Sequence, residues 1–147
     1  MSRAISASSF GFSACADPPA RHKAAAAHAD GVGLFRTELQ FMVAQRMPSA
    51  AEQQALYSQA FAASGGRPVT VRTLDIGGDK PAPYLPIPAE ENPALGLRGI
   101  RVALARPEVL DAQLRAILSV PDVARCRIMV PMVASADEMI AVRAALD

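Results

Sequence analysis

Two apolar runs of this chain each stop abruptly at an arginine, and this pattern constrains the fold more than any other feature. The runs lie in GVGLFRTELQFM, residues 31–42, and in PVTVRTLDIGGDK, residues 68–80. Their β-branched and apolar residues are typical of buried parallel strands. Arg36 and Arg72 would then lie at the carboxyl ends of these strands, which form the active-site edge of α/β folds.

Two arginines at one sheet edge predict a site for an anion such as a phosphate or a carboxylate. A guanidinium group offers paired donors in a fixed planar geometry that matches the oxygens of these anions. The alternative is that Arg36 and Arg72 are surface cations that cap their strands. Spacing alone leaves both interpretations open.

The rest of the sequence alternates predicted helices with predicted strands, which indicates an α/β fold. Ser49 and Glu52 have the spacing of a capping box, and the helix that they open would end at Gly65 and Gly66. Pro107 begins another predicted helix. Its apolar face would consist of Leu110, Leu114, Ile117 and Leu118.

Helices are also predicted near both ends of the chain. Asp17, which two prolines follow, would start an alanine-rich helix that runs to about Ala29. Ser135 and Glu138 repeat the capping-box pattern, and the helix after them is expected to continue to Asp147.

A connection of about thirty residues separates the strand that ends near Asp75 from the helix at Pro107. It contains Pro81, Pro83, Pro86, Pro88 and Pro93. Connections of this length are uncommon unless they are functional or disordered, and prolines stiffen the backbone. We therefore expect an ordered active-site lid, with a floppy insertion as the alternative.

Composition narrows the possible partners and locations. A formal net charge of +1 gives no reason to expect a nucleic acid or an anionic membrane as a partner. No stretch approaches the roughly 18 to 20 apolar residues of a spanning helix, and residues 1–16 lack the apolar core of a cleaved signal. The cytoplasm is therefore the expected location. Cys15 and Cys126 lie far apart without a metal-ligand pattern, so neither a disulfide nor a catalytic thiol is expected.

Three segments carry a resemblance to a known family: GVGLFRTELQFM, residues 31–42; VRTLDIGGDKPAPYLPIPAEENPALGLRGIR, residues 71–101; and RIMVPMVASADEM, residues 127–139. In this order and spacing they resemble the phosphoenolpyruvate-utilising enzymes. Within that family they are similar to the phosphoenolpyruvate-binding barrel of Enzyme I, the phosphoenolpyruvate-protein phosphotransferases of the sugar and nitrogen phosphotransferase systems. GGDK, residues 77–80, fits that branch, whereas Gly99 is more similar to the pyruvate phosphate dikinase and phosphoenolpyruvate synthase branches.

The resemblance implies a partial (β/α)8 TIM barrel that comprises roughly the first half of the fold. The strands near Val32, Val69 and Ile128 would be the second, third and fourth, and the first would fall within residues 4–14. ISASSFGFS, residues 5–13, lacks the Asn-Ile-Gly with which the family normally opens the barrel. The expected domains are a poorly matching N-terminal segment, residues 1–28, and a C-terminally truncated barrel, residues 29–147.

The resemblance also implies roles for individual residues. Arg36 and Arg72 match the arginines that grip the phosphoryl group and the enolate oxygen of phosphoenolpyruvate. Arg98, in LGLRGIR, matches a third arginine that reaches the same pocket from the end of the long connection. Paired donors at the equatorial oxygens are what a loose phosphoryl-transfer transition state requires. Three further residues would support these arginines: Glu38, Asp75 and Lys80.

By the same resemblance, no catalytic residue and no metal ligand is expected within the chain. The family's Mg²⁺ ligands and the cysteine that protonates the enolate would follow Asp147. The phosphoacceptor histidine and the region that docks the carrier protein would precede the chain. His22 and His28 lack the glycine- and serine-rich setting of that histidine and are expected on a helix surface. The chain would therefore carry the phosphate-gripping half of a magnesium-dependent site.

The leading functional hypothesis is a fragment of a phosphoenolpyruvate-protein phosphotransferase, inactive by itself. The intact enzymes of this family are homodimers that pass a phosphoryl group from phosphoenolpyruvate to an enzyme histidine and on to a carrier protein, leaving pyruvate. A fragment of pyruvate phosphate dikinase or phosphoenolpyruvate synthase is a second enzyme hypothesis. A non-catalytic partial barrel that associates with itself and ignores phosphoenolpyruvate is the alternative of a different class.

Overall fold

The computed structural model describes residues 5–6, 30–78 and 82–147. The predicted alanine-rich helix, both histidines and Lys80 lie outside the described residues. Within the described ranges, no helix combines the length and the apolar character that a membrane span requires.

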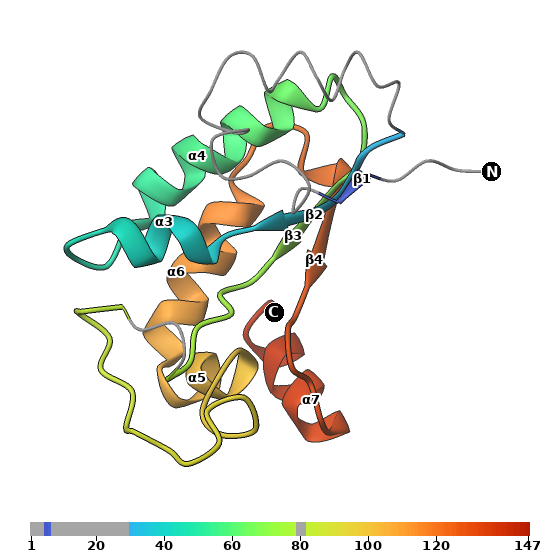
Figure 1. The fold of residues 1–147 in the computed structure, drawn as a ribbon. Helices are drawn as coiled ribbons and strands as arrows, with labels where there is room; N and C mark the ends of the chain where they lie inside the picture. Colours follow the sequence, from blue (N-terminus) through green and yellow to red (C-terminus); the bar gives the residue numbers. More distant parts are fainter. Residues whose placement is uncertain (1–4, 7–29, 79–81) are drawn as a thin grey trace.

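A four-stranded parallel sheet forms the centre of the fold (Figure 1). Its strands are β1 (Ile5–Ser6), β2 (Val32–Arg36), β3 (Val69–Arg72) and β4 (Cys126–Met129), and their spatial order follows the sequence. All three neighbouring pairs are parallel. The strands predicted near Val32, Val69 and Ile128 are therefore present, and β1 lies inside the range predicted for the opening strand.

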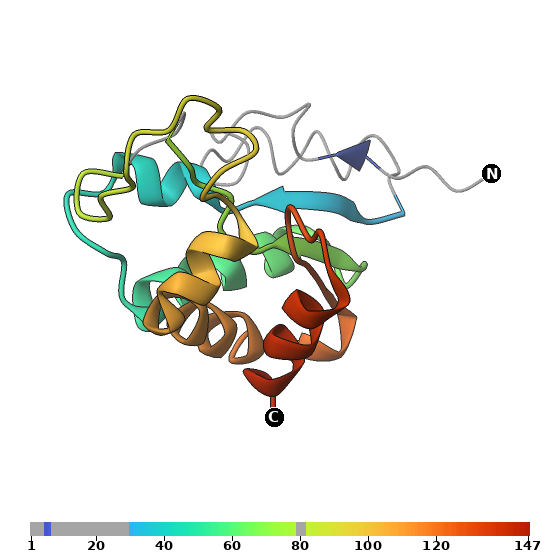
Figure 2. The ribbon, with the colours of Figure 1, turned by 90° about the horizontal axis from the view of Figure 1, so that it is seen from below.

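Two helices pack against one face of the sheet, as Figures 1 and 2 show for α4 (Ala50–Ala63) and α6 (Pro107–Leu118). The alternation of strand side chains explains this packing, because every second residue of a strand faces the same side. Val69 and Val71 of β3 are fully buried there, whereas Thr70 and Arg72 face the other side and are half-buried. The resulting core joins Phe35, Val69 and Val71 to Tyr57, Phe61 and Ile117.

The capping box predicted at the start of α4 is present. The Ser49 hydroxyl accepts a hydrogen bond from the backbone N–H of Glu52, and the Glu52 carboxylate accepts one from the backbone N–H of Ser49. These two bonds satisfy amide groups that otherwise lack partners in the first turn of a helix. Gly65 and Gly66, both at positive φ, follow the helix as predicted.

Replacement of Ser49 by alanine should lower the free energy of unfolding by about 1 kcal/mol, because the cap hydroxyl is lost. Urea unfolding followed by circular dichroism measures this change. Ser58→Ala is the matched control, since Ser58 lies inside the same helix and alanine has the higher helix propensity. An equal loss in both variants would contradict the capping role.

Two details of the predicted helices are wrong. Leu118 is 46% exposed. The buried face of α6 includes Gln113 and Ile117, and Leu118 lies at the edge of that face. The last helix, α7 (Ala136–Ala144), ends before Asp147. Its final turn tightens through a bond from the Leu146 N–H to the Arg143 carbonyl, 3.0 Å, which packs Leu146 against the core.

The described residues of the long connection after β3 include several that pack against the rest of the fold, unlike a floppy insertion. The connection ends in a short helix, α5 (Ile100–Ala105), before α6. Ile76, Ala82 and Leu85 are buried in a second apolar cluster with Phe41 of α3 (Glu38–Val43). The Tyr84 hydroxyl also donates to the Phe41 carbonyl, 2.6 Å. The connection is thereby fixed beside α3, beyond the carboxyl ends of β2 and β3 (Figure 1).

Candidate functional site

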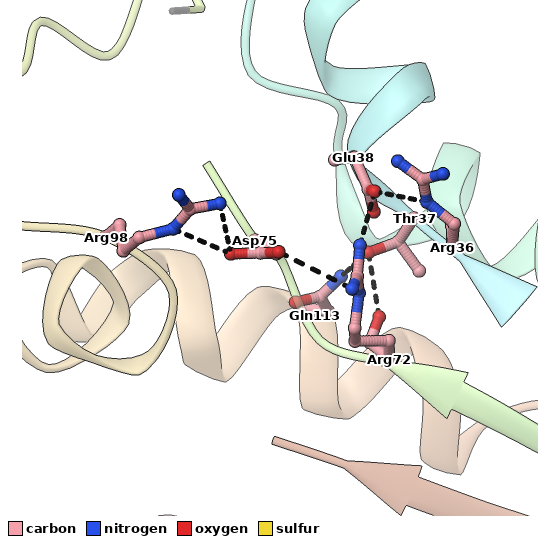
Figure 3. Close-up of polar contacts among 7 residues, drawn as sticks. All are labelled: Arg36, Thr37, Glu38, Arg72, Asp75, Arg98 and Gln113. Carbon is pink, nitrogen blue, oxygen red and sulfur yellow. Dashed lines mark hydrogen bonds and ion pairs between the residues drawn. The ribbon is translucent and has the colours of Figure 1, made fainter. Parts of the chain in front are cut away.

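The register of the central strands brings Arg36 and Arg72 to the same sheet edge. The two residues are direct partners across the β2–β3 pair, and both strands end at these arginines. Parallel strands present their carboxyl ends together, so side chains that follow the ends converge. Figure 3 shows the resulting group of polar side chains.

Glu38 links the two arginines. Its side chain is 1% exposed, and Oε1 accepts from the Nε of Arg36 at 2.7 Å and from a terminal nitrogen of Arg72 at 2.5 Å. Asp75 continues the chain of contacts: one carboxylate oxygen lies 3.5 Å from Arg72 and the other lies 3.4 Å from Arg98. Among these five side chains, three guanidinium groups therefore alternate with two carboxylates.

The pKa of Glu38 is lowered in this setting. Burial by itself would raise it, but hydrogen bonds from its own backbone N–H and from Arg36, together with the charge of Arg72, favour the ionised form more strongly. A buried carboxylate that stays ionised fixes both arginines and keeps them from repelling each other. Glu38 thus contacts both arginines, and its role in orienting them stays a prediction.

Arg36 is the most accessible of the three arginines, with 36% of its side chain exposed, against 15% for Arg72 and 11% for Arg98. Its Nε donates to Glu38 (Figure 3), and among the described residues no hydrogen bond engages its two terminal nitrogens. Among the described residues, Glu38 Oε2 and Arg72 Nε are buried without a hydrogen-bond partner. Buried polar atoms without a partner are uncommon in folded proteins, so these two atoms mark this edge as a candidate site.

The stability of the chain should depend on pH through Glu38. A folded-state pKa below the ordinary value of 4.5 means that the ionised form contributes stability above that pH. This contribution is lost as the pH falls through the folded-state pKa. The stability advantage of the wild-type chain over Glu38→Gln should therefore be constant near neutrality and shrink below about pH 4.5. Urea unfolding between about pH 3 and pH 7 tests this prediction, and an advantage that grows with acid would contradict it.

A buried polar cluster lies behind the arginines, and the sequence analysis missed it. Gln113 of α6 and Tyr57 of α4 form its centre, and Thr37, Gln53 and Gln40 complete it. Burial raises the pKa of Tyr57 to about 12, although hydrogen bonds from Gln113 and Gln40 act against this rise, so the hydroxyl stays protonated. The sequence did contain one sign of this cluster: Gln113 lies between Leu110 and Leu114, which belong to the predicted apolar face of the helix.

The residues at this edge do not fit a magnesium site. Mg²⁺ requires oxygen ligands in octahedral geometry, whereas both buried carboxylates are engaged with arginines. The described residues also contain no group of three histidine, cysteine, aspartate or glutamate side chains that could hold a metal ion. Burial raises the pKa of Cys126, which is a half-buried residue of β4 and not an activated thiol.

A parallel sheet with clustered arginines beyond its carboxyl edge is an α/β domain with a candidate anion site. Residues 11–147 match the family model described as the PEP-binding domain of PEP-utilising enzymes. The chain therefore belongs to the phosphoenolpyruvate-utilising enzyme family, as its motifs predicted.

Curated relatives agree with this assignment. The chain is 44% identical over 119 residues to the phosphoenolpyruvate-protein phosphotransferase of Haemophilus influenzae, which covers 81% of this chain and 21% of that protein. It is 46% identical over 119 residues to the enzyme of the same name from Staphylococcus carnosus, with the same coverage of 81% and 21%. A multiphosphoryl transfer protein of Rhodobacter capsulatus is 46% identical over 113 residues, 77% of this chain and 14% of that protein. The chain thus spans about a fifth or less of the length of these relatives.

Proposed function

We propose that the chain supplies the phosphate-gripping part of the phosphoenolpyruvate site of a phosphoenolpyruvate-protein phosphotransferase. The observation that carries this proposal is the convergence of Arg36, Arg72 and Arg98 on two buried carboxylates at one sheet edge. The names of the relatives supply the substrate and the reaction class.

The chemistry of the three arginines suits a phosphoryl group. Each guanidinium presents paired donors that can contact two oxygens at once, and the donors are in place before the anion arrives. Glu38 and Asp75 both contact Arg72 (Figure 3), while the terminal nitrogens of Arg36 form no hydrogen bond with another described residue. We assign Arg36 the first contact with the phosphoryl oxygens, with Arg72 and Arg98 completing the pocket.

The remaining parts of the function follow from the same proposal. Residues 29–147, together with β1, form the opening half of a (β/α)8 barrel, and Lys80 supports the long connection. The enzyme is a cytoplasmic homodimer, and its phosphoryl acceptor is a histidine that hands the group to a carrier protein. Mg²⁺ would be held by residues elsewhere in the enzyme and would supply positive charge for the substrate oxygens. The chain alone grips the phosphoryl group without transferring it.

Titration of the chain with phosphoenolpyruvate, followed by phosphorus NMR, tests this proposal. We expect weak binding in roughly the millimolar range for a partial site. Arg36→Lys keeps the charge but loses the paired donors, so it should weaken binding clearly. Arg115→Lys is the matched control, because Arg115 pairs with Asp111 on the exposed face of α6, away from the site. Equal affinities for the chain and both variants would refute the proposed site.

A further inference from the structure

Gln113 is a buried polar residue, with 1% of its surface exposed, and its side chain makes three hydrogen bonds. Its Oε1 accepts from the backbone N–H of Leu74 at 2.7 Å. Its Nε2 donates to the hydroxyl oxygens of Thr37 and Tyr57, each at 3.1 Å. A backbone amide can only donate, so the Leu74 contact fixes the orientation of the side-chain amide.

The partners of Gln113 belong to the two segments that carry the arginines. Thr37 lies between Arg36 and Glu38, and Leu74 lies between Arg72 and Asp75. Gln113 is 76 positions from Thr37 and 39 positions from Leu74 along the chain. A single side chain from α6 therefore ties together the two segments that follow β2 and β3 (Figure 3).

Because the Gln113 side-chain amide donates to Thr37, it also determines which way the hydrogen bond between Thr37 and Arg72 runs. The Thr37 hydroxyl accepts from Gln113, so its own hydrogen is free to donate to the Arg72 carbonyl, 2.9 Å away. Thr37 precedes α3 but makes no side-chain cap for that helix, because its hydroxyl serves this contact. A carboxylate in place of the amide would draw the hydroxyl hydrogen to itself and leave the Arg72 carbonyl without its donor.

We propose that Gln113 is a positioning residue for the anion site: by holding Thr37 and Leu74 together, it keeps Arg36 and Arg72 directed at one anion. It does not touch the anion itself. This inference rests on the proposed function for its effect on binding, but its effect on the arginines can be observed without any ligand.

The test compares Gln113→Leu with Gln53→Leu in the full chain. Gln53 is an equally buried glutamine of the same cluster. It accepts from the Tyr57 hydroxyl and donates to the Pro48 carbonyl, but among the described residues it forms no hydrogen bond with either arginine-bearing segment. Urea unfolding shows whether the two variants lose comparable stability. The readouts are phosphoenolpyruvate affinity by phosphorus NMR and the ¹H–¹⁵N signal of the Arg36 Nε–H group, which is assigned from its loss in Arg36→Lys.

We expect Gln113→Leu to weaken phosphoenolpyruvate binding about tenfold or more and to shift or broaden the Arg36 signal. Gln53→Leu should leave both readouts near their wild-type values. Equal effects of the two variants, or an unchanged Arg36 signal in Gln113→Leu, would overturn the proposal. If the wild-type chain binds no phosphoenolpyruvate, the proposed function falls, and the Arg36 signal still decides the role of Gln113.

A second pair of variants covers the case in which Gln113→Leu does not fold. Thr37→Ser keeps the hydroxyl that links Gln113 to the Arg72 carbonyl, whereas Thr37→Val removes it at a similar volume. Retention of the Arg36 signal and of binding in Thr37→Ser, with loss of both in Thr37→Val, supports the proposal. Identical behaviour of the two variants overturns it.

Discussion

Replacement of Arg72 by alanine is expected to destabilise the chain by about 3 kcal/mol, because it removes one of the two arginine partners of each buried carboxylate. Arg72 lies between Glu38 and Asp75, whose side chains are 1% and 8% exposed. Removal of the guanidinium leaves Glu38 with Arg36 alone and removes one of the two arginine contacts of Asp75. Phosphoenolpyruvate affinity should fall roughly tenfold or more at the same time.

Urea unfolding and the phosphoenolpyruvate titration measure the two effects of Arg72→Ala. Arg115→Ala removes the same charge from an exposed ion pair with Asp111 and should change neither quantity measurably. Addition of Glu38→Gln to Arg72→Ala should recover part of the lost stability, because it removes the buried negative charge of Glu38, which has lost one of its two arginine partners. A double variant that recovers no stability would show that the stability loss of Arg72→Ala arises from lost packing and not from the charge of the Glu38 carboxylate.

Replacement of Gly99 by alanine is expected to cost about 2 kcal/mol or more, because Gly99 adopts a conformation that only glycine tolerates. Its φ of 55° and ψ of −126° lie outside the regions open to other residues. An added Cβ would also lie 3.0 Å from the Pro131 carbonyl oxygen and 3.1 Å from the Met132 side chain. The backbone cannot easily move aside, since the Gly99 N–H donates to the Ile76 carbonyl at 3.0 Å.

The effect of Gly99→Ala should extend to the site, because Arg98 is the preceding residue and contacts Asp75 at 3.4 Å. Gly65→Ala is the control that separates backbone conformation from crowding. Gly65 also has a positive φ, 62°, but an added Cβ there would meet no atom within 4 Å. Its replacement should cost only about 1 kcal/mol and leave phosphoenolpyruvate affinity unchanged. Equal losses in the two variants would contradict the role of the Pro131 contact.

Local sequence patterns were sufficient to predict most elements of the fold. Both capping boxes depend on residues three positions apart, and the strands depend on short apolar runs, so each pattern is complete within one segment. The end of α7 and the exposure of Leu118 were not predictable in this way. Both depend on which arc of a helix meets the core, and residues far away in the sequence set that arc.

Some features of the candidate site were also predictable from the sequence, and others were visible only in the tertiary structure. The sequence determined that Arg36 and Arg72 follow strands, and therefore that they belong at the carboxyl edge of a sheet. Only the tertiary structure decided that Glu38 holds both arginines and that Asp75 joins Arg72 to Arg98. It also decided that Gln113 ties the two strand ends together. The physical reason is that the spacing of apolar residues along the chain determines local secondary structure. A carboxylate or amide that is shared by several partners instead requires side chains from distant segments to meet in one buried volume.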